Sequence, residues 1–136
     1  MDDVQAFAQG IFASQPFSRF IGAELTGSSK DHAELTIPIT DQLKQQHGFV
    51  HGGVISYLAD NAITFAGGLA LGGNALTAEF KINYLRPGVG THLVARAKAR
   101  AVSKRQAVCQ CEVFAVDASG EEKLCALAQG TVVPAA

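Results

Sequence analysis

The chain has 136 residues, a length that suits one compact domain, and 48% of them are hydrophobic, which is enough for a core and excludes a disordered chain. Charged residues make up 17% and give a formal net charge of -1, so the basic field that drives nucleic-acid binding is missing. The acidic N-terminus and the polar interruptions of the longest apolar run, 54–71, argue against a secretory leader and a membrane span. We therefore expect one cytoplasmic domain over residues 1–136.

The first half of the chain predicts helix, hairpin and then a second helix. Apolar residues at helical spacing predict an N-terminal helix within residues 1–14, and Phe17, Phe20 and Ile21 predict one more turn. Residues 23–28 and 32–39 are expected to form a β-hairpin, since the second segment alternates between apolar and polar positions. A long central helix follows over 53–71, and Gly72-Gly73-Asn74 ends it.

The second half predicts strands only, over 76–85, 91–103, 107–116 and 124–133. Short connections between them predict antiparallel neighbours in one sheet. The predicted class is α+β, with the long central helix wrapped by a five- or six-stranded antiparallel sheet. Because the helix has almost no polar face, we expect the sheet to cover much of it and a second subunit to cover part of the rest. The Gly67-Gly68 pair is expected to permit a close approach of helix and sheet.

Three cysteines, Cys109, Cys111 and Cys125, are an odd number and lack zinc-ligand spacing. We interpret them as small apolar core residues in a reducing compartment. Neither a metal nor a redox cofactor is predicted.

The chemistry is expected on the central helix. Asp60 is its one carboxylate, and burying an unpaired charge costs several kcal/mol, on the order of 3–5, so packing alone is a poor reason for its presence. Thr64 lies four residues further on and Tyr57 one turn earlier, so both share a face with Asp60.

A second group of residues marks the start of that helix. Gly52 and Gly53 lie where backbone N–H groups have no intrahelical partner, which favours an oxyanion or a polarised carbonyl. Gln45 adds a side-chain amide just upstream. Gly52 and Asp60 are eight residues apart, about 12 Å along a helix axis, so one carbonyl cannot touch both within one subunit. If both act on one bond, two subunits share the site.

Three segments together resemble a known family. They are Gln45-x-x-Gly48-x-Val50-His51-Gly52-Gly53, then Leu58-Ala59-Asp60, then Asn83-Tyr84-Leu85-Arg86-Pro87-Gly88. This pattern is similar to that of the hotdog-fold acyl-CoA thioesterases of the phenylacetic-acid-degradation type, over about residues 15–133. The resemblance implies a hotdog fold, an acyl-CoA substrate, a homodimer and, in many members, a homotetramer built as a dimer of dimers.

The resemblance also implies roles for single residues. Asp60 matches the carboxylate that attacks the thioester or deprotonates water, and the Gly52 N–H matches the group that polarises the carbonyl from the opposite subunit. The remaining catalytic positions it implies are Gln45, His51, Thr64 and Thr77, and which threonine positions the water stays open.

Substrate contacts are expected at three kinds of position. Gly53, Phe49 and Tyr57 are candidates beside the reacting bond. Arg86, Lys104 and Arg105 are candidates for the phosphates of coenzyme A, which counts here as part of the substrate. A pocket lined by residues such as Phe49, Phe65, Leu69 and Phe80 suits aryl, arylacetyl or aliphatic acyl groups alike.

Two other functions stay open at this stage. An enoyl-thioester hydratase or dehydratase could pair His51 with Asp60 for proton transfer. A non-catalytic module could bind acyl-CoA without turnover. Four residues of this region also have a purely structural interpretation. A neighbouring hydroxyl could satisfy Asp60, and His51 could bond only to the backbone of its turn. Tyr57 and Asn61 could be packing contacts.

Overall fold

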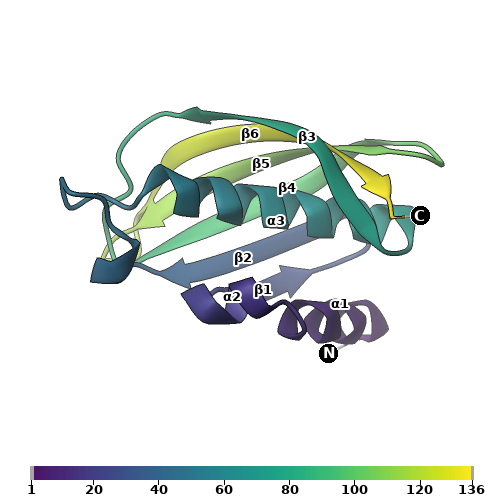
Figure 1. Cartoon of the computed structure of the whole chain (residues 1–136), viewed down its shortest axis with the longest axis horizontal. Coiled ribbons are helices and arrows are strands. Elements are labelled where there is room, and N and C mark those ends of the chain that lie inside the picture. The colour runs from purple at the N-terminus through teal and green to yellow at the C-terminus, as the bar shows by residue number, and fades with distance from the viewer. Residues whose placement is uncertain (1, 136) are drawn as a thin grey trace.

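The computed structural model describes residues 2–135, in which a six-stranded antiparallel sheet wraps around the long helix α3 (Gly52–Leu71) (Figure 1). This confirms the predicted α+β class and the hotdog arrangement. The helix begins one residue earlier than predicted, and Gly72 ends it with a φ of 84°, a conformation that glycine adopts without strain.

The other predicted elements are confirmed with small shifts at their ends. The shorter helices are α1 (Asp3–Ala13), α2 (Pro16–Ile21) and the 3-10 turn η1 (Asp41–Leu43). The strands are β1 (Glu24–Ser28), β2 (His32–Pro38), β3 (Ala75–Tyr84), β4 (His92–Val102), β5 (Ala107–Val116) and β6 (Glu122–Pro134).

The strand order is β1-β2-β4-β5-β6-β3, which corrects one prediction. The last four strands are not all consecutive neighbours, because β3 pairs with β6 and β4 pairs with β2 and β5. The connection from β3 to β4 passes the N-terminal end of α3, where Gly88 lies against Val50 and Ile55. That crossover leaves β3 as an edge strand beside the helix.

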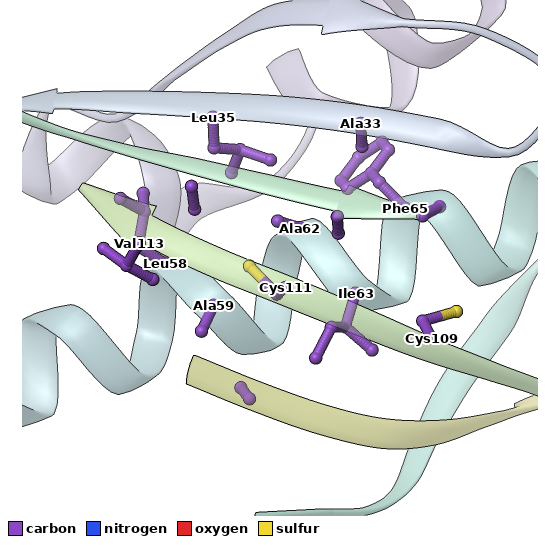
Figure 2. Packing of buried hydrophobic residues seen from close by; sticks show 14 of the residues in the cluster. Ala33, Leu35, Leu58, Ala59, Ala62, Ile63, Phe65, Cys109, Cys111 and Val113 are labelled. Carbon is purple, nitrogen blue, oxygen red and sulfur yellow. The ribbon is translucent and has the colours of Figure 1, made fainter. Parts of the chain in front are cut away.

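The core lies between α3 and the inner face of the sheet (Figure 2). Leu58, Ala59, Ala62 and Ile63 are buried on the helix and meet buried strand residues such as Val113. Cys109, Cys111 and Cys125 are free thiols in this core, which confirms their interpretation as apolar core residues.

Gly67 explains how closely the helix approaches the sheet. A Cβ atom at this position would lie 2.7 Å from Cβ of Val132 on β6. The close approach predicted for the glycine pair is therefore confirmed at Gly67, whereas Gly68 faces the Gly73 carbonyl and Ala75.

By length and composition α3 could cross a membrane, but in this fold it is the core helix that the sheet wraps.

One face of α3 is only partly covered. Asp60, Asn61 and Thr64 are half-buried on it, whereas Ala59, Ala62 and Ile63 on the other side are fully buried. The helix is therefore not buried all round within one chain, and its half-buried face carries the candidate catalytic side chains.

Candidate active site

Asp60 lies in the middle of α3, and its carboxylate is held by a residue of β3. Thr77 donates its hydroxyl to Oδ1 of Asp60 at 2.7 Å. Among residues 2–135, no hydrogen bond to Oδ2 is found, so this oxygen remains free to accept a proton or to attack. A hydrogen bond from a neutral hydroxyl to a carboxylate contributes about 1.5–3 kcal/mol.

Thr64 lies behind this pair. Its hydroxyl is 2.6 Å from that of Thr77, 2.8 Å from the backbone carbonyl of Asp60 and 3.5 Å from Oδ1. Each hydroxyl has one hydrogen to donate. When Thr77 donates to Asp60, Thr64 donates either to the Asp60 carbonyl or to Thr77. The structure brings both threonines to Asp60, with Thr77 as its shorter side-chain contact.

A β-bulge explains why Thr77 faces the helix. The pairing of β3 with β6 shifts between Thr77 and Glu79, which inserts Ala78 into the strand. Along β3 the half-buried positions are Ala75, Thr77, Phe80 and Ile82, so the inserted residue keeps both halves of the strand turned toward the core.

A hollow opens beside Asp60 between α2 and α3. Phe17 and Tyr57 pack edge to face in its wall, with ring centroids 5.2 Å apart. Tyr57 borders this hollow, and its hydroxyl is bonded to Ser18 and receives a hydrogen bond from Asn61 at 3.1 Å. The hydroxyl of Tyr57 is therefore engaged within the protein, in the cluster that joins α2 to α3.

The N-terminal end of α3 leaves one backbone amide free. His51 caps the helix, since its Nδ1 accepts the Gly53 N–H at 2.8 Å and its carbonyl accepts the Val54 N–H at 2.9 Å. No acceptor for the Gly52 N–H is found within the described chain. Of the two glycine amides proposed from the sequence, that of Gly52 is available to a substrate carbonyl and that of Gly53 is occupied. The cap also means that a neutral His51 carries its hydrogen on Nε2.

A second hollow surrounds Gly52. Gln45, Phe49, Tyr84 and Arg86 line it, so three predicted site residues do gather at this glycine. Tyr84 donates its hydroxyl to the Gly52 carbonyl at 3.1 Å and lies 3.1 Å from the Ser56 hydroxyl. The side-chain oxygen of Gln45 accepts the His47 N–H, which leaves its NH₂ group as the donor on offer.

The two hollows are separate within one chain. They share no lining residue, and Gly52 and Asp60 are eight residues apart on the continuous helix α3, about 12 Å along its axis. One carbonyl cannot contact both groups of the same chain. The chain therefore presents two separate hollows, one with a carboxylate and one with an amide donor.

The three residues predicted to bind the coenzyme A phosphates do not lie at one place in the structure. Arg86 borders the Gly52 hollow. Lys104 and Arg105 lie in the β4–β5 turn, which follows Val102 and is at the opposite end of β4 from His92 and the crossover. Of these three predicted residues, Arg86 is the one that lies near the N-terminal end of α3.

The aromatic residues expected around an acyl group also separate. Phe65 is buried against Phe12 with ring centroids 5.8 Å apart, and it lines a groove together with Leu69. Phe49 lies in the Gly52 hollow, and Phe80 packs partly against the core. Within residues 2–135, these four residues are divided among the groove, the Gly52 hollow and the core.

The cysteines are poor candidates for nucleophiles. Burial raises the pKa of Cys109 and of Cys125 to about 11 and that of Cys111 to about 12. These thiols stay protonated at neutral pH, and a protonated thiol attacks carbonyl groups poorly. Asp60 is the carboxylate of α3, it lines a hollow, and one of its oxygens has no hydrogen bond within residues 2–135.

Three residues with structural roles at the site are not predicted from the sequence. Tyr84 enters only as part of a motif, and Gln15 and Ser18 are not among the candidates. All three contact α3 through partners 28 to 46 residues away in sequence. The one sequence signal was the position of Tyr84 directly before Leu85-Arg86-Pro87-Gly88.

Comparisons with known proteins identify the family of the chain. The sequence model of the thioesterase superfamily matches residues 47–120, and the chain belongs to this superfamily of thioester hydrolases. The acyl-coenzyme A thioesterase PaaI of Escherichia coli is 29% identical over 127 residues, which cover 90% of this chain and 85% of that protein.

Solved structures show the same fold. A thioesterase family protein from Silicibacter pomeroyi superposes with a TM-score of 0.85 at 29% identity and covers 96% of both chains. A mutant of the phenylacetic acid degradation protein PaaI from Thermus thermophilus gives a TM-score of 0.78 at 30% identity, over 89% of this chain and all of that one. The fold is that of a PaaI-like thioesterase.

Proposed function

We propose that this protein hydrolyses the thioester of an acyl-CoA to the free acid and coenzyme A. The observation that carries the proposal is the Asp60 carboxylate, which lines a hollow and has one oxygen held by Thr77 and the other without a hydrogen bond in the described chain. The named activity of the Escherichia coli relative supports coenzyme A as the thiol.

Two routes use the same carboxylate. In the first, Oδ2 of Asp60 attacks the carbonyl carbon, the coenzyme A thiolate leaves, and water then hydrolyses the mixed anhydride. In the second, Asp60 takes a proton from water as the hydroxide attacks the carbonyl, and the thiolate leaves with a proton. Both routes place negative charge on the carbonyl oxygen, which a free backbone N–H stabilises.

That N–H is proposed to come from Gly52 of a second copy of the chain. The distance along α3 rules out Gly52 and Asp60 of one chain, and the half-buried face of the helix is available for a neighbour. The assembly we propose is a homodimer with two shared sites, and a homotetramer stays possible as a pair of such dimers.

Arg86 is the proposed contact for the coenzyme A phosphates, because it borders the hollow of Gly52. Lys104 and Arg105 could take part only from another copy of the chain.

Neither a metal nor a further cofactor is needed by either route. A cytoplasmic location is supported by three buried free cysteines, which suit a reducing compartment.

The hydratase alternative is less well supported. Nδ1 of His51 is occupied in capping α3, and this holds for whichever copy of the chain brings His51 to Asp60. It retains only the Nε2 hydrogen as a donor, so it is not a free base beside Asp60. Nothing in the geometry favours a binding module over an enzyme.

The test is release of free thiol from a panel of acyl-CoA esters by the purified protein. We expect turnover by the parent protein and a loss of at least about 100-fold in kcat for Asp60→Asn. Asp3→Asn, at an exposed position in the first turn of α1, is the matched control and should retain full activity. Melting temperatures should show that both variants fold.

Other outcomes would overturn the proposal. Full activity of Asp60→Asn removes the carboxylate from the mechanism. Water addition to an enoyl-CoA, followed by absorbance, would favour the hydratase. Binding of acyl-CoA in calorimetry with the ester recovered intact would favour the binding module.

A further inference from the structure

A groove adjoins the Asp60 hollow and has no role in the proposed function so far. It lies between α1, the C-terminal half of α3 and the start of β3, and its apolar lining is Phe7, Ala8, Ile11, Phe65, Leu69 and Leu76. None of the residues that line it carries a charge. Any ligand that it prefers is therefore uncharged and apolar along its length.

The groove and the Asp60 hollow are adjacent, because Gln15 and Thr64 line both. Thr64 is in the hydrogen-bond chain to Thr77 and Asp60. Gln15 accepts hydrogen bonds from Ser18 at 2.6 Å and from Asn61 at 2.9 Å, so it stays fixed between the two spaces. A molecule whose reacting carbonyl is at Asp60 can thus extend directly past Thr64.

The wall made by α1 is anchored to the rest of the protein. Gln9 donates its side-chain amide to the Leu25 carbonyl at 2.6 Å, and Phe12 packs on Phe65. The groove is therefore largely pre-formed, which reduces the entropy lost when a flexible chain binds.

We propose that this groove binds the acyl chain of the substrate and selects an extended aliphatic acyl group over an aroyl group. The proposal rests on the acyl-CoA thioesterase function. From Asp60 to Leu69 the helix advances nine residues, about 14 Å, so a single ring attached directly to the carbonyl would fill only the beginning of the groove. An aliphatic chain can follow its whole apolar length and bury each methylene.

The test is the dependence of kcat/KM on acyl length, from butanoyl-CoA to dodecanoyl-CoA, with benzoyl-CoA included. The parent protein should gain about fourfold per added methylene, the ratio that corresponds to burying one CH2, until the groove is full. Benzoyl-CoA should be hydrolysed less well than decanoyl-CoA.

Glycine substitutions give a matched pair of variants. A Cβ atom at Gly73, which lines the groove, has no neighbour within 4 Å, and the same is true of Gly10, which does not line it. Gly73→Phe should lower kcat/KM for decanoyl-CoA by about tenfold or more and leave butanoyl-CoA unchanged. Gly10→Phe should leave the whole length profile unchanged.

A second pair opens the groove instead of filling it. Phe7 lines the groove, whereas Phe20 on α2 is 84% exposed and does not. Phe7→Ala should weaken the preference for long chains, and Phe20→Ala should not.

The outcomes separate the two proposals. If no acyl-CoA is hydrolysed, the proposed function fails. If esters are hydrolysed but the profile is flat, benzoyl-CoA is preferred, or Gly73→Phe affects all lengths equally, the groove proposal alone is wrong. It is also overturned if Gly73→Phe changes the oligomeric state with the length profile intact, because the groove would then be a contact between copies of the chain.

Discussion

Thr77 controls which way the Asp60 carboxylate points. Its hydroxyl occupies Oδ1, and the β3 bulge fixes the threonine itself, so the free oxygen is directed by a strand rather than by a mobile loop. Thr77 touches Asp60 and is therefore assigned as a positioning residue. Thr64 donates its one hydrogen either to the backbone carbonyl of Asp60 or to the Thr77 hydroxyl, and it lies 3.5 Å from Oδ1 of Asp60.

This difference gives unequal expectations for the two threonines. Thr77→Val should lower kcat by about 10- to 100-fold, the range expected when a hydrogen bond to a charged group is lost. Thr64→Val should have a smaller effect, and Thr77→Ser should restore most of the activity because it retains the hydroxyl. Steady-state kinetics with an acyl-CoA ester measures all three, and a Thr77→Val enzyme as active as the parent would contradict the assignment.

The three cysteines make a second prediction at the residue scale. Because burial raises the pKa of each thiol to about 11 or 12, the reactive thiolate is scarce even at pH 9. We expect negligible labelling of the native protein by a thiol reagent at pH 8 and labelling of all three cysteines in denaturant. Rapid labelling of the folded protein would show that the core is more open than the structure indicates.

The raised pKa values of the three thiols also determine how the free energy of unfolding changes with pH. Unfolded thiols ionise near pH 9, and the folded ones do so only at higher pH. The unfolded state therefore binds fewer protons between these values, so this contribution to the free energy of unfolding decreases as the pH rises from 9 to 11. A Cys111→Ala variant should show a shallower decrease over this range in denaturant titrations.

Local sequence patterns were sufficient to find some of these residues and not others. Asp60 stood out as the one carboxylate of an apolar helix, and Gly52 as a glycine at the helix start. The sequence could not rank Thr64 against Thr77, because Thr77 reaches Asp60 through a bulge that alternation alone does not reveal. Nor could it show that His51 caps Gly53 and leaves the Gly52 amide free.

At the scale of elements, α2 is fixed to α3 by a polar cluster. Ser18 is buried and bonds both Gln15 and Tyr57, and Asn61 joins the same group. A six-residue helix buries little apolar area, so these hydrogen bonds account for its defined place beside Asp60. The one turn expected around Phe17 and Phe20 is thus a wall of the candidate site.

The contact between α3 and β6 allows a sharp prediction about packing. Gly67→Ala places a Cβ 2.7 Å from two carbons of Val132, so the helix or the strand must shift. We expect the free energy of unfolding to fall by about 1–3 kcal/mol. Gly10→Ala on α1, where the added atom meets open space, should instead raise it by up to about 1 kcal/mol.

Chemical denaturation of both variants and the parent measures this difference. A Gly67→Ala protein as stable as the Gly10→Ala protein would show that the approach of helix and sheet is looser than described.

The elements themselves were predictable, but their order in the sheet was not. Periodicity identifies each helix and strand from nearby residues, whereas strand order depends on pairings between distant segments. The short connection between β3 and β4 favoured a hairpin, and only the packing of Gly88 on Val50 and Ile55 shows that it crosses the end of the helix.

At the scale of the whole molecule, the account depends on two half-sites that meet across two copies of the chain. The role of the Gly52 backbone N–H can be tested by a substitution that leaves α3 folded. It is the first residue of α3, where proline is well tolerated, and His51 has φ -58° and ψ 134°, a conformation that suits a residue before proline. Gly52→Pro therefore removes the N–H and keeps the backbone, and Gly52→Ala is the control that retains it.

The most direct measurement is a complementation assay. Asp60→Asn and Gly52→Pro proteins, each nearly inactive alone, are unfolded together, refolded and assayed for thiol release. In a mixed dimer, the intact carboxylate of one copy meets the intact amide of the other, so about a quarter of the parental activity should return when the copies mix at random. A mixture that forms dimers but regains no activity would contradict the shared site.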